Sequence, residues 1–176
     1  MANMKRSNLS WVHPNLIIKK IPIGKGVFAK SRIRKGEIIT IYGGYVFTAV
    51  EESIFPTQMR DFALQISPKF VIGLRKKTQL QISDYINHSC SPNTGFKGQI
   101  FVVAMKDIGK GEQITFDYCM VLSKVKGIKP YRFICRCGSS NCRKIITWND
   151  WKNPSLQKKY LGYFQWYLED RIRKAK

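Results

Sequence analysis

The sequence predicts a mostly β fold with minor α content, in which several small sheets carry a cysteine-bearing loop and one C-terminal helix. Short runs rich in β-branched and aromatic residues recur along the chain, and glycine-containing turns separate them. Apolar residues take up a helical spacing only after residue 153. With 176 residues and 44% hydrophobic content, the chain can bury one compact core with a small appendage.

The predicted strands follow one another between residues 16 and 116. The first covers residues 16–21 and stops at Pro22, and the run Gly24-Lys25-Gly26 then permits either a close backbone approach or an ordinary hairpin turn. Further strands are predicted at residues 38–42, at 61–66 and 70–74 as a pair, at 100–105 and at 113–116. Thr48 and Glu51 have the spacing of a capping box, which predicts the start of a short helix.

One helix is predicted at the C-terminus, after a charged connector at residues 120–130. Asn153 is a good N-cap and Pro154 suits the first helical position. An apolar stripe at helical spacing follows: Leu156, Tyr160, Tyr163, Phe164, Tyr167, Leu168 and Ile172. The stripe favours packing against the sheet over a ligand-binding surface. Residues 1–14 are polar and are expected to form a loose N-terminal arm.

The formal net charge of +20 is distributed unevenly. Residues 1–35 hold nine Lys/Arg and no acid, residues 36–119 hold eight of each sign, and residues 120–176 hold fourteen Lys/Arg against three acids. Two cationic flanks around a neutral middle favour a polyanion as neighbour, either nucleic acid or an anionic membrane surface. A merely solvated surface is the alternative.

Several classes of protein do not fit the sequence. No apolar run approaches the roughly 18 residues of a membrane-spanning helix. The pair Lys5-Arg6 is followed by polar residues, so a secretory signal is not expected. Five cysteines is an odd number, and four of them suit a metal site, which indicates a reducing intracellular compartment.

Three of the cysteines predict a zinc site. Cys135, Cys137 and Cys142 lie in one glycine-bearing loop, where a short segment can wrap a metal ion. Either water completes a catalytic site or a distant thiol closes a structural one. Cys90, in a loop beside Pro92, is favoured over Cys119, which follows a strand and has the pattern of a small buried residue. Free thiols without metal are the alternative.

Three motifs occur in the order Asn87-His88-Ser89-Cys90-Ser91-Pro92-Asn93, Phe116-Asp117-Tyr118 and C-x-C-x4-C. Together they resemble the SET-domain protein-lysine methyltransferases with a post-SET zinc module, in a minimal form like those of bacteria, archaea and large viruses. The resemblance covers about residues 15–147. It implies a β-clip-like fold with a pseudoknot, in which the segment holding Tyr118 threads beneath the loop holding Asn87, and it assigns the fourth zinc ligand to Cys90.

The resemblance also implies a division of the chain. It gives an arm at residues 1–14, a SET domain at 15–119, a connector at 120–130, a post-SET zinc module at 131–147 and a basic C-terminal helix at 148–176.

The resemblance implies a channel for the substrate lysine. Tyr118 matches the catalytic tyrosine, Tyr42 matches a second tyrosine of the channel, and Phe116 matches the position where phenylalanine leaves room for a second or third methyl group. A lysine amine must be neutral to attack, and an aromatic channel lowers its pKa by desolvation. Taken singly, each of these aromatic residues would more often belong to a core.

The cofactor that the resemblance implies is S-adenosylmethionine, together with one structural zinc ion. The positions that match its pocket are Gly24, Lys25, Gly26, Phe28, Tyr85, Asn87, His88, Tyr118 and Ile145. Lys25 and Gly26 would act through backbone groups, and Ile145 would cover the adenine. Asp84 departs from the family, which usually has arginine there.

The sequence therefore favours an enzyme that transfers methyl groups from S-adenosylmethionine to protein lysines. The expected substrate is a basic protein, a histone or histone-like protein bound to nucleic acid, with a ribosomal protein as the runner-up. A zinc-stabilised chromatin or nucleic-acid binding module without catalysis is the alternative. The expected compartment is the cytoplasm or nucleoid of a prokaryote, or the nucleus and chromatin of a eukaryote or of an infected host. The sequence predicts no oligomeric state.

Overall fold

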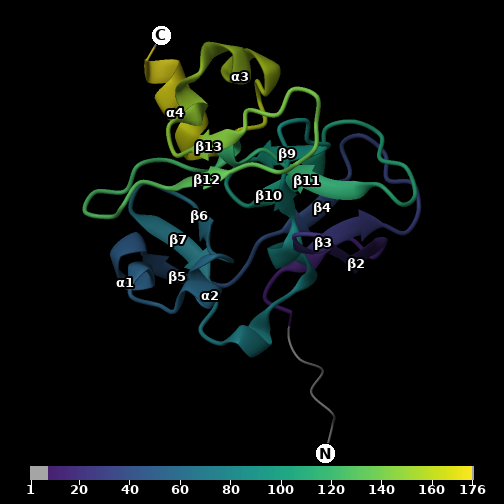
Figure 1. Ribbon diagram of the computed structural model, residues 1–176, viewed down its shortest axis with the longest axis horizontal. Helices are drawn as coiled ribbons and strands as arrows, with labels where there is room; N and C mark the ends of the chain where they lie inside the picture. Colours follow the sequence, from purple (N-terminus) through teal and green to yellow (C-terminus); the bar gives the residue numbers. More distant parts are fainter. Residues whose placement is uncertain (1–7, 176) are drawn as a thin grey trace, which may run out of the picture.

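The computed structural model describes residues 8–175, whose strands form four small sheets (Figure 1). The first sheet has the order β1-β4-β10-β9 and is antiparallel throughout. Its strands are β1 (Trp11–Val12), β4 (Ile38–Ile41), β9 (Thr94–Lys97) and β10 (Phe101–Ala104). Apart from Gly95 and Ala104, the buried residues of these strands are β-branched or aromatic, as expected for a pleated surface with one buried face.

The second sheet positions the main motifs. Its order is β2-β3-β11-β8, with β2 (Leu16–Ile21), β3 (Gly24–Ala29), β8 (Asn87–His88) and β11 (Gln113–Phe116). The pairing of β8 with β11 is parallel, with Phe116 opposite His88. Parallel neighbours require a crossover connection, so two segments about 30 residues apart meet with their motifs side by side. The threading of one segment beneath the other stays a prediction.

The remaining elements lie around these sheets. A third sheet has the order β5-β7-β6, with β5 (Tyr45–Thr48), β6 (Leu64–Gln65) and β7 (Phe70–Gly73), and the fourth pairs β12 (Arg132–Ile134) with β13 (Ile145–Thr147). The helices are α1 (Ala49–Ser53), α2 (Thr57–Arg60), α3 (Pro154–Lys159) and α4 (Trp166–Lys174). Single 3-10 turns are η1 (Lys77–Gln79), η2 (Ile82–Tyr85), η3 (Tyr118–Met120) and η4 (Asp150–Lys152).

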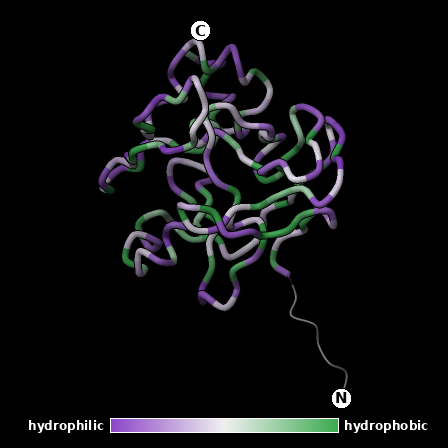
Figure 2. Tube along the Cα trace, turned by 45° about the vertical axis from the view of Figure 1, so that its right-hand side comes forward, coloured by the Kyte–Doolittle hydropathy of each residue, from purple (hydrophilic) through white to green (hydrophobic). Residues whose placement is uncertain are grey.

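The main hydrophobic core joins the sheets to the C-terminal segment. Hydrophobic stretches run through the interior strands, while hydrophilic stretches lie on outer loops (Figure 2). Val27, Ile39, Phe96 and Ile108 are fully buried, and Leu168 of α4 packs in the same cluster. The apolar stripe of the C-terminal segment is therefore core, as predicted.

The predicted C-terminal helix is present, but the segment is divided into two helices, α3 and α4, instead of forming a single one. Gly162 between them has φ +77°, in the left-handed region that favours glycine. The N–H of Gln165 donates to the carbonyl of Met120 at 3.0 Å, and that of Trp166 to Gly98 at 3.0 Å. These backbone donors bond to residues 98 and 120 instead of the preceding helical turn, so the helix cannot continue.

Two other local predictions need correction, and one is confirmed. The loose arm predicted at residues 1–14 is wrong for its described part, since Trp11–Val12 pairs with β4 and the Ser10 N–H donates to Gln81 Oε1 at 2.8 Å; residues 1–7 lie outside the described residues. The strand predicted at residues 61–66 shrinks to Leu64–Gln65, because α2 and its C-cap take the preceding residues. The capping box of Thr48 and Glu51 forms.

Within residues 8–175, no helix combines the length and the apolar character that crossing a bilayer demands.

Candidate active site and zinc centre

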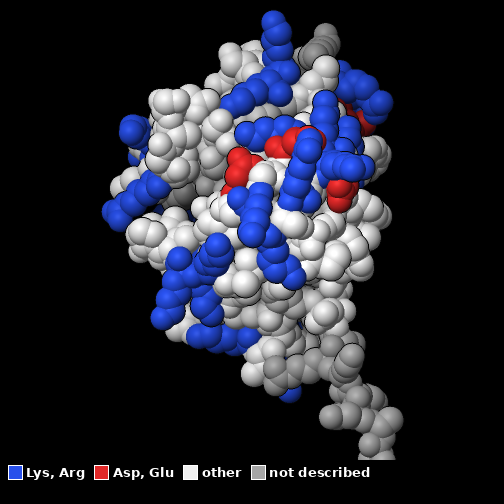
Figure 3. All heavy atoms as spheres, turned by 90° about the vertical axis from the view of Figure 1, so that its right-hand side faces the viewer, with Lys and Arg blue, Asp and Glu red and all other residues white. Residues whose placement is uncertain are grey.

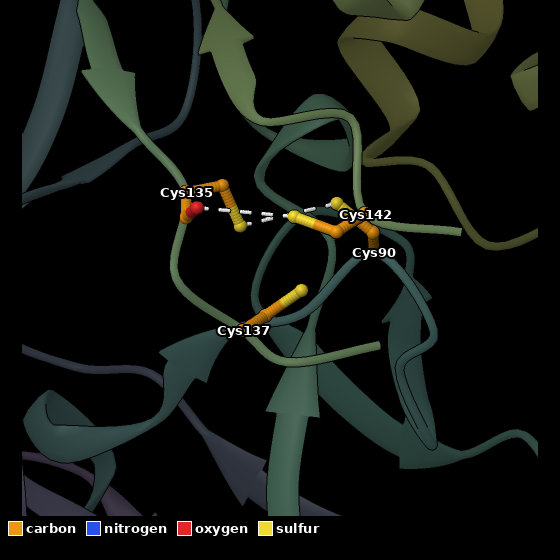
Figure 4. A group of neighbouring side chains, drawn as sticks. All are labelled: Cys90, Cys135, Cys137 and Cys142. Carbon is orange, nitrogen blue, oxygen red and sulfur yellow. Dashed lines mark hydrogen bonds between the residues drawn. The ribbon is translucent and has the colours of Figure 1, made fainter. Parts of the chain in front are cut away.

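Four cysteines meet at the junction of the core and the loop between β12 and β13 (Figure 4). The sulfur atoms of Cys90, Cys135, Cys137 and Cys142 all lie within 4.8 Å of one another, and the Sγ atoms of Cys90 and Cys135 are 4.0 Å apart. Tetrahedral bonds of ~2.3 Å to zinc place sulfurs about 3.8 Å apart. The four thiols therefore fit one structural zinc ion.

The surroundings of the cluster also suit thiolates. The backbone N–H groups of Arg143 and Lys144 donate to the sulfurs of Cys90 and Cys142, each at 3.4 Å. Cys119, the other candidate for the fourth position, is fully buried in the main core and lies outside the cluster. The structure thus brings Cys90, and not Cys119, to the three thiols of the loop, as the choice of Cys90 requires, and its role as a zinc ligand stays a prediction.

An aromatic cavity lies beside this centre. It has a volume of about 90 Å³, and its wall includes Tyr42, Phe116 and Tyr118. The rings of Phe116 and Tyr118 have centroids 5.1 Å apart. Burial raises the pKa of both tyrosine hydroxyls above their ordinary range, with the nearby Asp84 carboxyl adding to the effect on Tyr42. Both phenols therefore stay neutral and can act as hydrogen-bond partners in the cavity.

Two features fix the position of Tyr42. Its backbone directly follows β4, and its hydroxyl donates to the carbonyl of Ser83 at 3.0 Å. Asp84 lines the same cavity. Burial raises the pKa of this carboxyl to about 6, although it accepts a hydrogen bond from the Gln81 N–H. The residue that departs from the family pattern thus lies at the channel itself.

His88 connects the zinc centre to Tyr118. Its Nδ1 accepts a hydrogen bond from the Tyr118 backbone N–H at 3.1 Å, and its Nε2 is 3.4 Å from Cys90 Sγ. Burial lowers the pKa of the imidazole to about 4, so the ring is neutral. Because Nδ1 accepts, the ring proton is on Nε2 and points at the Cys90 sulfur.

A buried ion-pair network supports the same junction. Asp117 is fully buried and accepts two hydrogen bonds from the Arg143 guanidinium, at 2.6 and 2.7 Å. Burial alone would raise the pKa of Asp117, but Arg143 holds it below its ordinary value. Tyr160 of the C-terminal segment donates to Asp117 at 3.2 Å, and Arg143 also bonds to Asp150. The zinc loop is thereby tied to the residue preceding Tyr118.

Two larger cavities adjoin this junction. One, of about 440 Å³, is lined by Asn87 and His88, by residues 21–23 of the β2–β3 hairpin and by Arg136 and Cys137 of the zinc loop. The other, of about 460 Å³, is a groove between α1, β6 and the connector, and it shares Asp61 and Tyr131 with the aromatic cavity. The aromatic cavity therefore opens toward the groove, and His88 separates it from the first cavity.

The structure brings together some of the predicted cofactor positions. Asn87 Nδ2 donates to the Lys25 carbonyl at 2.7 Å, and the Lys25 ammonium lies over the Tyr85 ring. A Cβ on Gly26 would lie 2.6 Å from Gln113 Nε2, so this glycine permits the close approach of β11. Only Asn87 and His88 of the predicted set line the 440 Å³ cavity.

The other predicted positions lie near it or farther away. Gly24 ends the hairpin turn at φ +120°, and Phe28 pairs with Gln113. Tyr118 lines the aromatic cavity instead. Ile145 pairs with Ile134 in the zinc module and is 40% exposed, so its cover over an adenine stays a prediction.

Sequence reasoning missed the Asp117–Arg143–Asp150 network and the aromatic residue Phe133. Phe133 contacts both His88 and Tyr118, with centroids 5.6 and 5.9 Å apart. Acids are scarce in the basic C-terminal flank, where Asp150 is one of three. That scarcity was a usable signal for a structural ion pair, whereas nothing in the sequence placed Phe133 against the channel.

The comparisons with known proteins agree with this geometry. Residues 24–119 match the SET domain family model, so the chain belongs to the SET domain family. The variant-silencing SET domain-containing protein of Plasmodium falciparum is 34% identical over 152 residues, 73% of this chain and 5% of that protein. Histone-lysine N-methyltransferase ASHH3 of Arabidopsis thaliana is 30% identical, over 74% of this chain and 37% of that protein. The chain thus spans a small part of these relatives.

Solved structures show the same fold. KRYPTONITE, in complex with mCHG DNA and SAH, matches with a TM-score of 0.56 and 24% sequence identity, over 76% of this chain and 29% of that one. A second KRYPTONITE structure, which also holds an H3(1-15) peptide, matches with a TM-score of 0.57. The mostly β architecture of small sheets predicted from the sequence is confirmed.

Proposed function

We propose that the protein transfers methyl groups from S-adenosylmethionine to lysine side chains of a protein substrate. One observation carries the proposal: an aromatic cavity with two neutral phenols lies between a groove and a second cavity lined by Asn87 and His88. The named relatives include histone-lysine N-methyltransferases, and the solved structures hold SAH.

The groove suits a polypeptide and the aromatic cavity suits a lysine stem. A lysine amine has an ordinary pKa of about 10.4 and must lose its proton before it attacks. The walls of Tyr42, Phe116 and Tyr118 remove water from the amine and so lower that pKa. The hydroxyls of Tyr42 and Tyr118 then orient the neutral nitrogen toward the methyl group, since the reaction depends mainly on correct positioning.

Asn87 and His88 would hold S-adenosylmethionine, with the Lys25 and Gly26 backbone beside them. When bound, the sulfonium supplies an electrophilic methyl group. His88 is neutral and bonds to the Tyr118 backbone, so it fixes the tyrosine relative to this cavity. Cys90, Cys135, Cys137 and Cys142 would hold the structural zinc that keeps residues 131–147, the post-SET module, over the channel.

A donor titration tests the proposal against the alternative of an inert binding module. The zinc-loaded protein should bind S-adenosylmethionine in isothermal titration, because the donor cavity is intact. Asn87→Ala should weaken this binding at least about tenfold through the lost polar contacts. Gln157→Ala, on the far C-terminal surface, is the matched control. Absence of donor binding by the wild type would favour the binding module.

We propose a histone or histone-like protein as substrate, because two carboxylates are available to a basic peptide in the groove and the relatives point to this substrate class. Glu52 and Asp61 line the groove together with Arg60, Lys129 and Arg132, so they can pair with basic flanking residues although the groove as a whole is not acidic. One named relative, ASHH3, is a histone-lysine N-methyltransferase, and a KRYPTONITE structure holds an H3 peptide and DNA. This substrate would place the protein at chromatin. Labelled methyl transfer to histones and to ribosomal proteins, read by mass spectrometry, separates the two substrate classes.

We propose that the product goes beyond monomethyl-lysine. Phe116 packs against Phe96 and Tyr118 and brings no hydroxyl into the channel. Phe116→Tyr should add a polar group that holds a water molecule where a second methyl group would fit. The measurement is the ratio of mono- to di- and trimethyl-lysine on one peptide. An unchanged ratio, with folding intact, would contradict the role of Phe116.

A further inference from the structure

We infer that one face of the molecule binds the phosphate backbone of DNA. This basic face consists of the β2–β3 hairpin and the loops at residues 30–37 and 105–112. Its cations, all exposed, are Lys19, Lys20, Lys25, Lys30, Arg32, Arg34, Lys35, Lys106 and Lys110. Lys and Arg side chains gather on the side of the molecule that faces the viewer in Figure 3, with few Asp and Glu among them, and the β2–β3 hairpin lies on that side in Figure 1.

The fold, and not the sequence order, creates this face. Ile33 and Ile108 form a β-bridge with two backbone hydrogen bonds of 2.9 Å, and the Gly111 N–H donates to the Ala29 carbonyl at 2.8 Å. Lys106 and Lys110 belong to the middle of the sequence, which is neutral as a whole. The bridge places them beside the cationic N-terminal flank, so the charges add on one surface.

The acids of the basic face leave most of its cations without a partner. The face carries nine Lys/Arg against Glu37, Asp107 and Glu112. Asp107 pairs with Arg32, Glu37 bonds to His13 and the Arg34 N–H, and Glu112 bonds to a backbone N–H. Among residues 8–175, Arg32 is thus the one cation of this face in an ion pair.

The hairpin holds like charges opposite each other. Lys20 on β2 is the direct cross-strand partner of Lys25 on β3. Like charges in this position destabilise a strand pair, and a bound anion would offset the repulsion. The ammonium groups of Lys19 and Lys25 lie over the rings of Phe28 and Tyr85, with Nζ to centroid distances of 5.2 and 5.1 Å. The rings restrain these cations at the surface.

The groove carries both signs of charge, because Glu52 and Asp61 line it together with Arg60, Lys129 and Arg132. None of the nine cations of the basic face lines the groove or the aromatic cavity. A peptide in the groove and a polyanion on the basic face would therefore occupy different parts of the molecule. DNA binding by the basic face rests on the proposed function, since it would bring the enzyme to a DNA-bound substrate. DNA binding can be measured without methyl transfer, so a failure of this inference is distinguishable from a failure of the proposed function.

Nucleic acid fits the basic face better than a lipid surface does. Its cations come from a hairpin and two loops, so they form a broad array, which suits the regular phosphates of a duplex. Surface attachment to lipid instead favours an amphipathic helix with an apolar face, and the basic face contains no helix within the described chain.

Fluorescence anisotropy with the zinc-loaded protein and a labelled duplex of roughly 30 base pairs tests the inference. The face variant carries Lys20→Gln, Lys30→Gln, Lys35→Gln and Lys110→Gln, none of which lines a cavity described above. Removing four phosphate contacts should flatten the plot of log Kd against log salt concentration by about three to four and weaken binding at least about tenfold.

The matched control removes the same charge elsewhere, by Lys69→Gln, Lys77→Gln, Lys126→Gln and Lys158→Gln, all at exposed positions. It should change Kd by less than about threefold, since its effect is long-range and screened. An equal loss in both variants would overturn the inference in favour of bulk charge. Weak DNA binding by the wild type, with tight binding to anionic phospholipid vesicles, would overturn it in favour of a membrane. Thermal unfolding checks that both variants fold.

Discussion

The two walls of the aromatic channel are built in different ways. Tyr42 and Phe116 come from the SET core and are 7% and 4% exposed, held by hydrophobic packing. Tyr131 lines the same cavity and Phe133 packs against Tyr118; both come from the zinc module, where Tyr131 is 46% exposed and Ile134 is 69% exposed. The core wall is stable by burial, whereas the outer wall depends on four thiols and one ion-pair network. Methyl transfer should therefore be more fragile than the fold.

Removal of zinc should have the largest effect, because it should disrupt the outer wall of the channel and leave the core wall intact. Chelation or Cys137→Ser should abolish methyl transfer, because residues 131–147 have little apolar burial of their own. The main core should keep its near-ultraviolet circular dichroism. Loss of that signal together with activity would mean that the two walls are not separate.

Breaking the ion-pair network should destabilise the protein strongly. Arg143→Met leaves the fully buried Asp117 carboxylate without its partner, which costs about 3 to 5 kcal/mol of unfolding free energy. Denaturant unfolding measures the loss. The double variant Arg143→Met/Asp117→Asn removes the uncompensated charge and should recover part of it. No recovery would show that the destabilisation comes from packing.

The core wall can be changed without loss of stability. Tyr118→Phe removes one hydroxyl whose hydrogen-bond partner would be the substrate, and it should lower kcat about a hundredfold, or about 2.7 kcal/mol. The unfolding midpoint should change little. The control is Tyr163→Phe, a tyrosine outside the channel. A variant of Tyr118 with wild-type kcat would remove it from the mechanism.

The smallest expected effect is a pH dependence of stability from Asp84. Its pKa is raised to about 6 in the fold, so it takes up a proton between pH 6 and 4 while the unfolded chain does not. The unfolding free energy should therefore rise as pH falls through this range, by at most about 2 kcal/mol. Asp84→Asn should remove this contribution, and the difference between the two unfolding profiles isolates it. Parallel profiles would contradict the raised pKa.

Much of the site could be predicted from the sequence because its residues lie in short, ordered motifs. The spacing of Cys135, Cys137 and Cys142 indicates a metal loop, and the position of Cys119 after a strand distinguishes it from Cys90. Predicted strands lie where β-branched runs end in glycine turns. These features could be predicted because the residues that cause them are neighbours in the sequence.

The rest depends on contacts between distant segments. The helix break after Tyr160 follows from backbone bonds to Gly98 and Met120, which no local pattern reveals. The pairing of Trp11–Val12 with β4 was likewise not predictable, because the polar residues around these two positions indicate a loose arm and the strand partner lies about 30 residues away. The basic face forms only because the Ile33–Ile108 bridge brings two segments together. Counting charge along the chain assigned its cations to two separate regions, so the face could not be recognised from the sequence.

The carbonyl of Cys90 accepts hydrogen bonds from Lys159 Nζ at 2.9 Å and from the Tyr160 hydroxyl at 3.2 Å. Two residues that follow the last cysteine in the sequence, Lys159 and Tyr160, thus fix the backbone of Cys90, the predicted zinc ligand farthest from them in the sequence. Cutting the chain after Thr147 would free that carbonyl and loosen the thiol's position, although every sulfur would be retained. The unit that must fold together therefore extends past the zinc loop into α3, and any transplant of this domain should carry α3 with it.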